Sequence, residues 1–143
     1  MFTYIASPYT PLDKTLSDEE KVAYMQRRFF EVAVYTHKEV KAGEPAFSPI
    51  IHGHTLHKLM PGLPTTWEFW WVVDGALLRQ AKMLDVLRLP GWQESVGVQT
   101  EIKEAKKIGM PIQYSSLPNY LVTMVDALML RWMRDSNARR LYP

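Results

Sequence analysis

The sequence contains no cysteine, which excludes disulfide bonds and thiolate chemistry. It also has no marked excess of charge, because 17 Lys and Arg face 15 Asp and Glu, for a formal net charge of +2. So small a charge favours neither a nucleic-acid-binding protein nor a membrane-surface protein. No apolar run reaches the roughly 18 residues of a membrane-spanning helix, and no signal-peptide pattern opens the chain. We therefore expect a cytoplasmic protein that binds neither a nucleic acid polymer nor a membrane.

The rest of the composition is that of one folded domain. The chain has 143 residues, 47% of them hydrophobic, with five Trp, seven Tyr and five Phe. This length is near the common domain size and is sufficient for a buried core, and the aromatic content argues against disorder. Because no linker, repeat or low-complexity segment interrupts the chain, we expect residues 1–143 to form a single domain.

Predicted strands and helices alternate along this chain. Short apolar runs predict strands at 2–6, 46–51, 83–89 and 110–114. Helical spacing and capping signals predict helices at 17–42, 67–82, 95–108 and 118–137, with a loop at 52–66. Ser17, with Glu20 three residues later, predicts a capping box at the start of the first helix. This order predicts an α/β fold: a doubly wound, flavodoxin- or Rossmann-like sheet of four to five mostly parallel strands with helices on both faces.

The carboxyl ends of the predicted strands are the expected place for a ligand. Parallel sheets of this kind bind ligands beyond that edge. Ser7, His52 and Gly91 each follow a predicted strand there. We therefore expect Ser7 and His52 to contact a substrate.

The most informative segment is Leu89–Pro111, which reads LPGWQESVGVQTEIKEAKKIGMP. It contains a Pro90-Gly91 turn, followed by Ser95 at the expected start of a helix. The Ser95 hydroxyl and the N–H groups of residues 96–98, beginning with Val96, can hold a phosphate or ribose oxygen. The alternative is a serine that only caps the helix.

Glu101 is the candidate carboxylate of this segment. No basic residue stands three or four positions after it to form a helical ion pair. Four positions before it lies Gly97, which leaves open space over the carboxylate but lowers helix stability by up to ~1 kcal/mol relative to Ala. Close approach by a ligand would give that glycine a purpose. The alternative is that Glu101 is a solvated surface residue.

Asp74 is a second candidate acid. It lies in the apolar stretch FWWVVDGALL, where burial of a carboxylate is unfavourable unless the group is paired or protonated. A raised pKa would suit Asp74 to act as a general acid. The alternative places it on the exposed stripe of an amphipathic helix.

Three closely spaced histidines, His52, His54 and His57, suggest a metal site. The chain has no cysteine, however, and no HExxH-type carboxylate partner lies nearby. We therefore expect no metal. We expect instead a loop that covers the ligand, in which one histidine contacts the substrate.

The last predicted helix is apolar on more than one face. One stripe and a neighbouring row of methionines make up this surface: Leu121, Val125, Leu128 and Trp132, then Met124, Met129 and Met133. A core helix and a subunit interface are both compatible with it, and we favour the interface.

The candidate residues together resemble a known family. They follow an order found in the nucleoside 2-deoxyribosyltransferase superfamily: Tyr4, Asp74, Ser95-x-Gly97-x-x-x-Glu101 and Ala105. That superfamily includes the nucleoside 5'-monophosphate N-glycosidases. The segment LPGWQESVGVQTEIKEA and the early Ser7-Pro8-Tyr9 also resemble the corresponding segments of a subgroup of small bacterial and phage proteins within that superfamily. The resemblance spans about residues 2–114.

This resemblance implies cleavage of the N-glycosidic bond of a nucleoside 5'-monophosphate or a nucleoside. Glu101 then corresponds to the nucleophile, and Asp74 to the group that protonates or hydrogen-bonds the departing base. Tyr4 corresponds to the residue that holds Glu101, with Tyr9 as a second candidate. Ser95 resembles the phosphate-anchoring residue of the monophosphate type. Water would release the sugar phosphate, or a second base would accept the sugar.

The resemblance also bears on partners and cofactors. It implies that no metal or organic cofactor is needed. It implies a homo-oligomer, a dimer or a tetramer, in which a neighbouring subunit completes each pocket. Two other functions are compatible with the same sequence: a non-catalytic nucleotide-binding module, and an oligomeric interaction protein that assembles through its Trp-rich and last helices.

Overall fold

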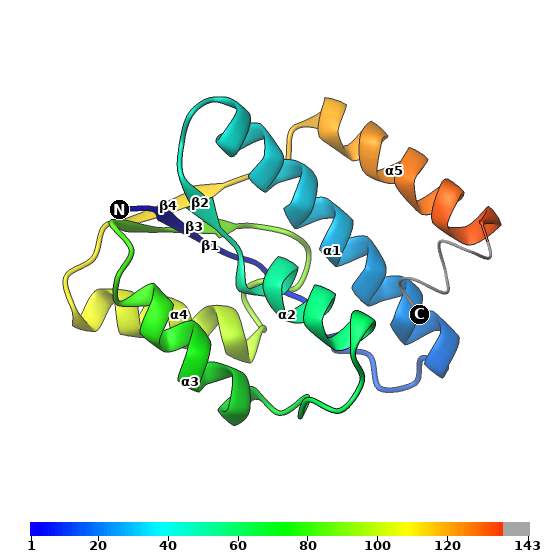
Figure 1. Ribbon diagram of the computed structural model, residues 1–143, viewed down its shortest axis with the longest axis horizontal. Coiled ribbons are helices and arrows are strands. Elements are labelled where there is room, and N and C mark those ends of the chain that lie inside the picture. The colour runs from blue at the N-terminus through cyan, green and yellow to red at the C-terminus, as the bar shows by residue number, and fades with distance from the viewer. Residues whose placement is uncertain (136–143) are drawn as a thin grey trace.

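The computed structural model describes residues 1–135, which form a four-stranded parallel sheet (Figure 1). The sheet order is β2-β1-β3-β4, and every neighbouring pair is parallel. The strands are β1 (Thr3–Ala6), β2 (Ala46–Phe47), β3 (Met83–Leu87) and β4 (Ile112–Ser115). The prediction of a doubly wound, Rossmann-like α/β sheet is confirmed, with four strands.

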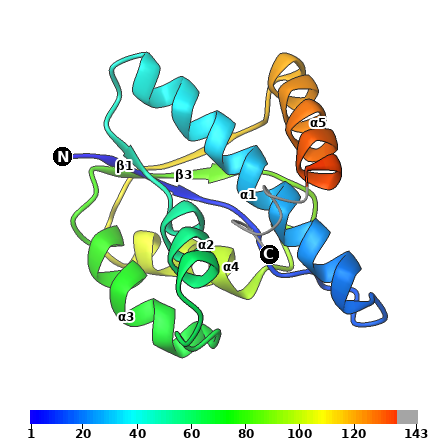
Figure 2. The ribbon, with the colours of Figure 1, turned by 45° about the vertical axis from the view of Figure 1, so that its right-hand side comes forward.

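Five helices pack around this sheet. They are α1 (Asp18–Lys41), α2 (Pro49–Leu59), α3 (Trp67–Leu78), α4 (Val96–Lys107) and α5 (Asn119–Arg134). Figures 1 and 2 show α1 and α5 on one face and α3 and α4 on the other. Helix α2 contacts both α1 and β1. The predicted helices on both faces are therefore confirmed.

Side chains alternate between the two faces along each central strand. Tyr4 and Ala6 of β1 pack with the buried residues of α3 and α4. Ile5 lies on the opposite face, where it packs with Val32 and Tyr35 of α1. Tyr4 therefore points toward α4 because it lies one residue out of step with Ile5.

Asp85 of β3 belongs to the α1 face. It is paired in register with Ile5, and its two carboxylate oxygens accept hydrogen bonds from Tyr35 Oη and Ser115 Oγ, both at 2.7 Å. These two hydrogen bonds join Asp85 of β3 to Tyr35 of α1 and to Ser115 of β4. This carboxylate thus has a structural role and lies across the sheet from Tyr4.

Capping signals set the bounds of α1. The Ser17 side chain accepts from the Glu20 N–H, and the Glu20 side chain accepts from the Ser17 N–H, which completes the predicted capping box. The helix ends at Lys41, and Gly43 follows with a φ of +88°, a left-handed conformation that favours glycine.

The predicted strand at 46–51 is confirmed only for residues 46–47, and the predicted loop at 52–66 only for residues 60–66, because a helix lies between them. The strand ends at Phe47, and Ser48 then caps α2 by accepting from the Ile51 N–H at 3.3 Å. Pro49 stands in the first turn, where its missing N–H does no harm. The second part of the apolar run is therefore the start of a helix. His52, His54 and His57 lie on α2 and not on a covering loop.

Other predicted bounds move by a few residues. Helix α3 ends at Leu78, before the predicted residue 82, and β3 ends at Leu87. Strand β4 is shifted to 112–115. Pro118 is the N-cap residue of α5, which begins at Asn119, and it makes no side-chain capping hydrogen bond. The predicted end of that helix at residue 137 lies outside the described residues. No helix among residues 1–135 combines the length and apolar composition that a membrane span requires.

The apolar stripe of α5 is part of the core of this chain. Leu121 and Val125 are buried against Val34 of α1, with Phe30 and Leu128 beside them. The core alternative therefore accounts for the stripe. Met124 and Met133, by contrast, remain exposed on the outward side of the helix.

Candidate active site

A buried hydrogen bond between Tyr4 and Glu101 forms the centre of the candidate site. Tyr4 Oη on β1 donates to Glu101 Oε1 on α4 at 2.7 Å. Glu101 is only 7% exposed, and Tyr4 is fully buried. Glu101 lies on the inward stripe of α4 with Val98, Ile102 and Ala105, so helical spacing directs the acid toward the sheet. The alternative of a solvated surface residue is wrong.

Burial controls the protonation of this pair. It raises the pKa of Glu101 to about 8, and the nearby charge of Asp74 adds to the rise, while the Tyr4 hydrogen bond lowers it in part. Burial likewise raises the pKa of Tyr4 well above its ordinary value. Tyr4 therefore remains a hydrogen-bond donor, and Glu101 in the free protein is mostly protonated at neutral pH.

Asp74 faces the same site from α3. It precedes the buried Gly75 and lies one turn before the buried Leu78. Its Oδ1 atom is buried without a hydrogen-bond partner within the described chain, and burial raises its pKa to about 6. Its charge also raises the pKa of Tyr4 and Glu101. The exposed-stripe alternative is therefore wrong, and a carboxyl in this state can carry a proton for donation.

Helix α3 is held beside α4 by residues that the sequence did not single out. Arg79 Nε binds Glu104 Oε1 of α4 at 2.6 Å. Trp71, whose ring lies over the α3 backbone at Gly75, packs against the core cluster to which α4 contributes Val98, Ile102 and Ala105. These contacts place Asp74 near Glu101. No local sequence pattern marks these residues, because their contacts form only when α3 packs on α4.

Ser95 caps α4, as its position predicted. Its Oγ accepts from the Val98 N–H at 3.3 Å. The N–H groups of Val96 and Gly97 lie in the first turn, where α4 itself supplies no carbonyl partner. An added Cβ at Gly97 would meet only Ser95 Oγ, at 4.0 Å. The predicted open space is present one turn before Glu101, beside a helix N-terminus that favours anions.

Ser7 and His52 each hold a buried polar atom that lacks a partner among residues 1–135. Ser7 directly follows β1 and is 5% exposed. The His52 ring stands edge-on to Trp70, with 6.4 Å between ring centroids, and lies 6.0 Å from Phe47, which in turn packs on Tyr4. His52 therefore borders the site through α2, although the predicted loop is a helix.

Tyr9 contacts α2 and not Glu101. Its hydroxyl lies 2.6 Å from His54 Nδ1, and His54 stacks on Phe29 of α1 at 4.2 Å between ring centroids. Burial lowers the pKa of His54 to about 4, so the ring is neutral and shares a hydrogen bond with the Tyr9 hydroxyl. Tyr9 thus ties the segment after β1 to α2, and only Tyr4 has the predicted role of holding Glu101.

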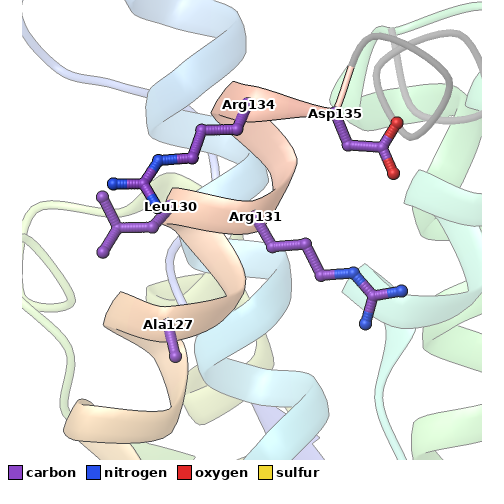
Figure 3. Close-up of a pocket in the computed structure, with 5 residues that line it drawn as sticks. All are labelled: Ala127, Leu130, Arg131, Arg134 and Asp135. Atoms are coloured by element: carbon purple, nitrogen blue, oxygen red, sulfur yellow. The ribbon is translucent and has the colours of Figure 1, made fainter.

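The part of the chain that the structure describes, residues 1–135, contains no group of three His, Asp or Glu side chains that could hold a metal ion. A hollow on the outer side of α5 is lined by Ala127, Leu130, Arg131, Arg134 and Asp135 (Figure 3). Because α5 covers the opposite face of the sheet from α4, this hollow is separate from the Tyr4–Glu101 pair.

Comparison with known proteins identifies the family. Residues 1–116 match the model of a domain of unknown function, DUF1937, and the chain belongs to this family. A search of curated proteins gave no match. The matched span includes Tyr4, Asp74, Ser95 and Glu101 and ends before α5. The match identifies a family and does not assign an activity.

Replacing Glu101 with Gln tests the buried acid through stability. The ordinary pKa of this glutamate is 4.5 and its folded value is about 8. Between these pH values the folded state keeps a proton that the unfolded state has lost, so the free energy of unfolding falls by up to about 1.4 kcal/mol per pH unit as pH rises. We expect Glu101→Gln to exceed wild type in stability at pH 8 and to approach it near pH 4.5, as measured by urea unfolding.

The exposed Glu94→Gln variant is the matched control, because it makes the same chemical change on the segment just before α4. A stability difference for Glu101→Gln that is the same at both pH values would contradict a buried, neutral acid.

Proposed function

We propose that this member of the DUF1937 family cleaves the N-glycosidic bond of a nucleoside 5'-monophosphate. The observation that carries the proposal is the buried Tyr4–Glu101 hydrogen bond with Asp74 close enough to raise the pKa of both groups. The order of these residues, which resembles the nucleoside 2-deoxyribosyltransferase superfamily, supports the same chemistry. The sugar passes either to water or to a second base.

In the proposed mechanism Glu101 is the nucleophile. Its carboxylate forms a bond to C1' of the sugar as the bond from C1' to the base nitrogen breaks and its electron pair leaves with the base. Tyr4 Oη donates to Oε1, which leaves Oε2 to attack. Positive charge that develops at C1' favours the ionised acid and offsets the effect of burial on its pKa.

Asp74 is the proposed proton donor to the departing base. Its pKa of about 6 and the Glu101 pKa of about 8 mean that the two carboxyls together hold one proton between these pH values. One proton is what the reaction needs, since one acid must be ionised to attack and the other protonated to donate. Substrate binding then has only to move that proton from Glu101 toward Asp74.

The N-terminus of α4 is the proposed anchor for the 5'-phosphate. Ser95 and the N–H groups of Val96 and Gly97 supply donors, and the helix dipole favours the negative charge. The gap at Gly97 lets a phosphate approach the backbone. Ser7 and His52, each with an unpartnered buried polar atom in the described chain, are the proposed contacts for the rest of the nucleotide.

Incubation with a panel of nucleoside 5'-monophosphates, with and without an acceptor base, tests this function. Chromatography should detect free base, or an exchanged base, from at least one of them. Glu101→Gln should lower the rate by at least about 10³-fold, and Asp74→Asn by roughly 10²–10⁴-fold. Exposed Asp126→Asn on α5 is the matched control and should keep full activity. Tight binding without release of base from any substrate would favour a non-catalytic nucleotide-binding module.

The pH profile of kcat/KM provides an independent test of the shared proton. Below about pH 6 both acids are protonated and no nucleophile remains, and above about pH 8 both are ionised and no proton is available. We expect a bell-shaped profile with its maximum between these values. In Asp74→Asn the acidic limb should still fall as Glu101 protonates, while the alkaline limb should flatten. A profile that rises steadily to pH 10 would count against Asp74 as the donor.

A second copy of this chain is the proposed partner, as the resemblance implies. The outward side of α5 exposes large apolar side chains that α1 does not cover: Tyr120, Met124, Leu130 and Met133. Exposed apolar surface of this kind favours association. Sedimentation equilibrium should give at least a dimer mass, and Met124→Lys with Met133→Lys should shift it toward the monomer. A monomer at all concentrations would contradict the proposal.

A further inference from the structure

Arg28 is a buried cation of α1 that lies outside the Tyr4–Glu101 site. Its side chain is 8% exposed, and that of its partner Glu31 is 6% exposed, with Nη1 and Oε2 at 2.6 Å. Removing two charges from water is unfavourable, and a buried ion pair adds little stability compared with apolar residues. Arg28 Nε also lacks a hydrogen-bond partner within residues 1–135. Stability alone is therefore a poor explanation for this arginine.

The other arm of the guanidinium reaches the segment between β3 and α4. Arg28 Nη2 donates to the Pro90 carbonyl at 3.1 Å and to Tyr24 Oη at 3.2 Å. The guanidinium also lies over the Tyr24 ring, 4.7 Å from its centroid. A charged donor on a backbone carbonyl is a strong hydrogen bond, so α1 holds the Pro90 turn in place.

This turn is continuous with the start of α4. The Trp92 N–H binds the Leu89 carbonyl at 3.1 Å, and the Glu94 N–H binds the Gly91 carbonyl at 3.2 Å. The next residue is Ser95, the N-cap of α4. Successive turns therefore connect the Pro90 carbonyl to the cap, so a shift at Pro90 moves the first N–H groups of the helix.

Gly91 shows how closely α1 and this turn approach each other. Its φ of +89° favours glycine, and an added Cβ would lie 3.6 Å from Leu12 and 4.0 Å from Tyr24 Oη. On the far side of the turn, Gln99 Nε2 of α4 donates to the Trp92 carbonyl at 3.2 Å. The turn is thus held from both sides, and on the α1 side Arg28 provides the charged contact.

We propose that Arg28 is a positioning residue that sets the N-terminus of α4 for the phosphate of the substrate. The proposal rests on the proposed function for the identity of that substrate. Arg28 acts through Pro90 and Ser95 and does not touch the substrate. Its loss should weaken binding of the phosphate and leave the chemistry at Glu101 unchanged.

Arg27 provides a matched control on the same helix. Its Nε binds the same Glu31 at 3.0 Å, but its Nη1 binds Asp126 of α5 at 2.9 Å, and its side chain is 37% exposed. Arg27→Lys and Arg28→Lys therefore disturb the same ion-pair network and keep the same charge. Only Arg28→Lys removes the hydrogen bond from Nη2 to the Pro90 carbonyl, since Lys lacks the planar fork with which Arg28 reaches Glu31 and Pro90 at once.

Hydrogen–deuterium exchange and steady-state kinetics test the proposal together. In Arg28→Lys, amides of residues 88–98 should exchange faster in the free protein, and the KM for a nucleoside 5'-monophosphate should rise about 10-fold, the effect of one charge-assisted hydrogen bond. The kcat, and the KM for the matching nucleoside without phosphate, should stay within about twofold. Arg27→Lys should leave all of these at wild-type values. Unchanged exchange at 88–98, or an equal rise of both KM values, would overturn the proposal.

Calorimetry with inorganic phosphate separates this proposal from the proposed function. If the protein cleaves no nucleotide, Arg28→Lys should still bind phosphate about 10-fold more weakly than Arg27→Lys, and equal affinities would overturn the role of Arg28. If Arg28→Lys does not fold, the double variant Arg28→Met with Glu31→Met replaces the pair by apolar residues, a change that folded proteins tolerate. It should show the same loss of phosphate affinity, and wild-type affinity would overturn the proposal.

Discussion

The hydrogen bond between Tyr4 and Glu101 is the constraint on which the candidate site depends. It joins the first strand to a helix 97 residues further along the chain and lies in a layer that excludes water. Such a position disfavours the charged form of the acid, which is why the pKa of Glu101 rises to about 8. The same burial lowers the stability of the folded chain as pH rises from 4.5 toward 8.

The period of two along β1 and β3 places Tyr4 and Asp85 on opposite faces of the sheet, so the structural carboxylate Asp85 is separated from the candidate catalytic carboxylates near Tyr4. Asp85 has two hydroxyl partners on the α1 face, one for each of its carboxylate oxygens. On the other face, Asp74 is close enough to Glu101 for its charge to raise the pKa of that acid, and Asp74 Oδ1 lacks a partner in the described part of the chain. A fully satisfied acid holds the fold together, while an unsatisfied one retains the capacity to bind or to transfer a proton.

Helix α1 contacts three separate parts of the molecule. Val32 and Tyr35 pack on one face of the sheet, and Val34 packs against α5. Arg28 reaches from the same helix to the turn that precedes α4. A single long helix therefore contacts α5, the sheet and the turn that precedes α4.

The sequence by itself determined the features that neighbouring residues create. The Ser17 capping box and the Ser95 cap each join atoms three positions apart, so local patterns predicted them correctly. The alternation of strands and helices likewise predicted the parallel α/β fold. The prediction of a strand over all of 46–51 failed because a short apolar segment fits a strand or a helix equally well. Ser48 caps a helix that begins at Pro49, so the strand ends before it.

Only the tertiary structure decided which side chains meet. The family resemblance placed Tyr4 beside Glu101, but composition and spacing could not, because the contact needs the register of β1 and the packing of α4 on it. Asp74 is half-buried because α3 packs on the apolar core residues of α4, and this could not be read from a helix that is apolar nearly all round. Tyr9 turned to His54 for the same reason: α2, a helix in place of the expected loop, brought that histidine within reach.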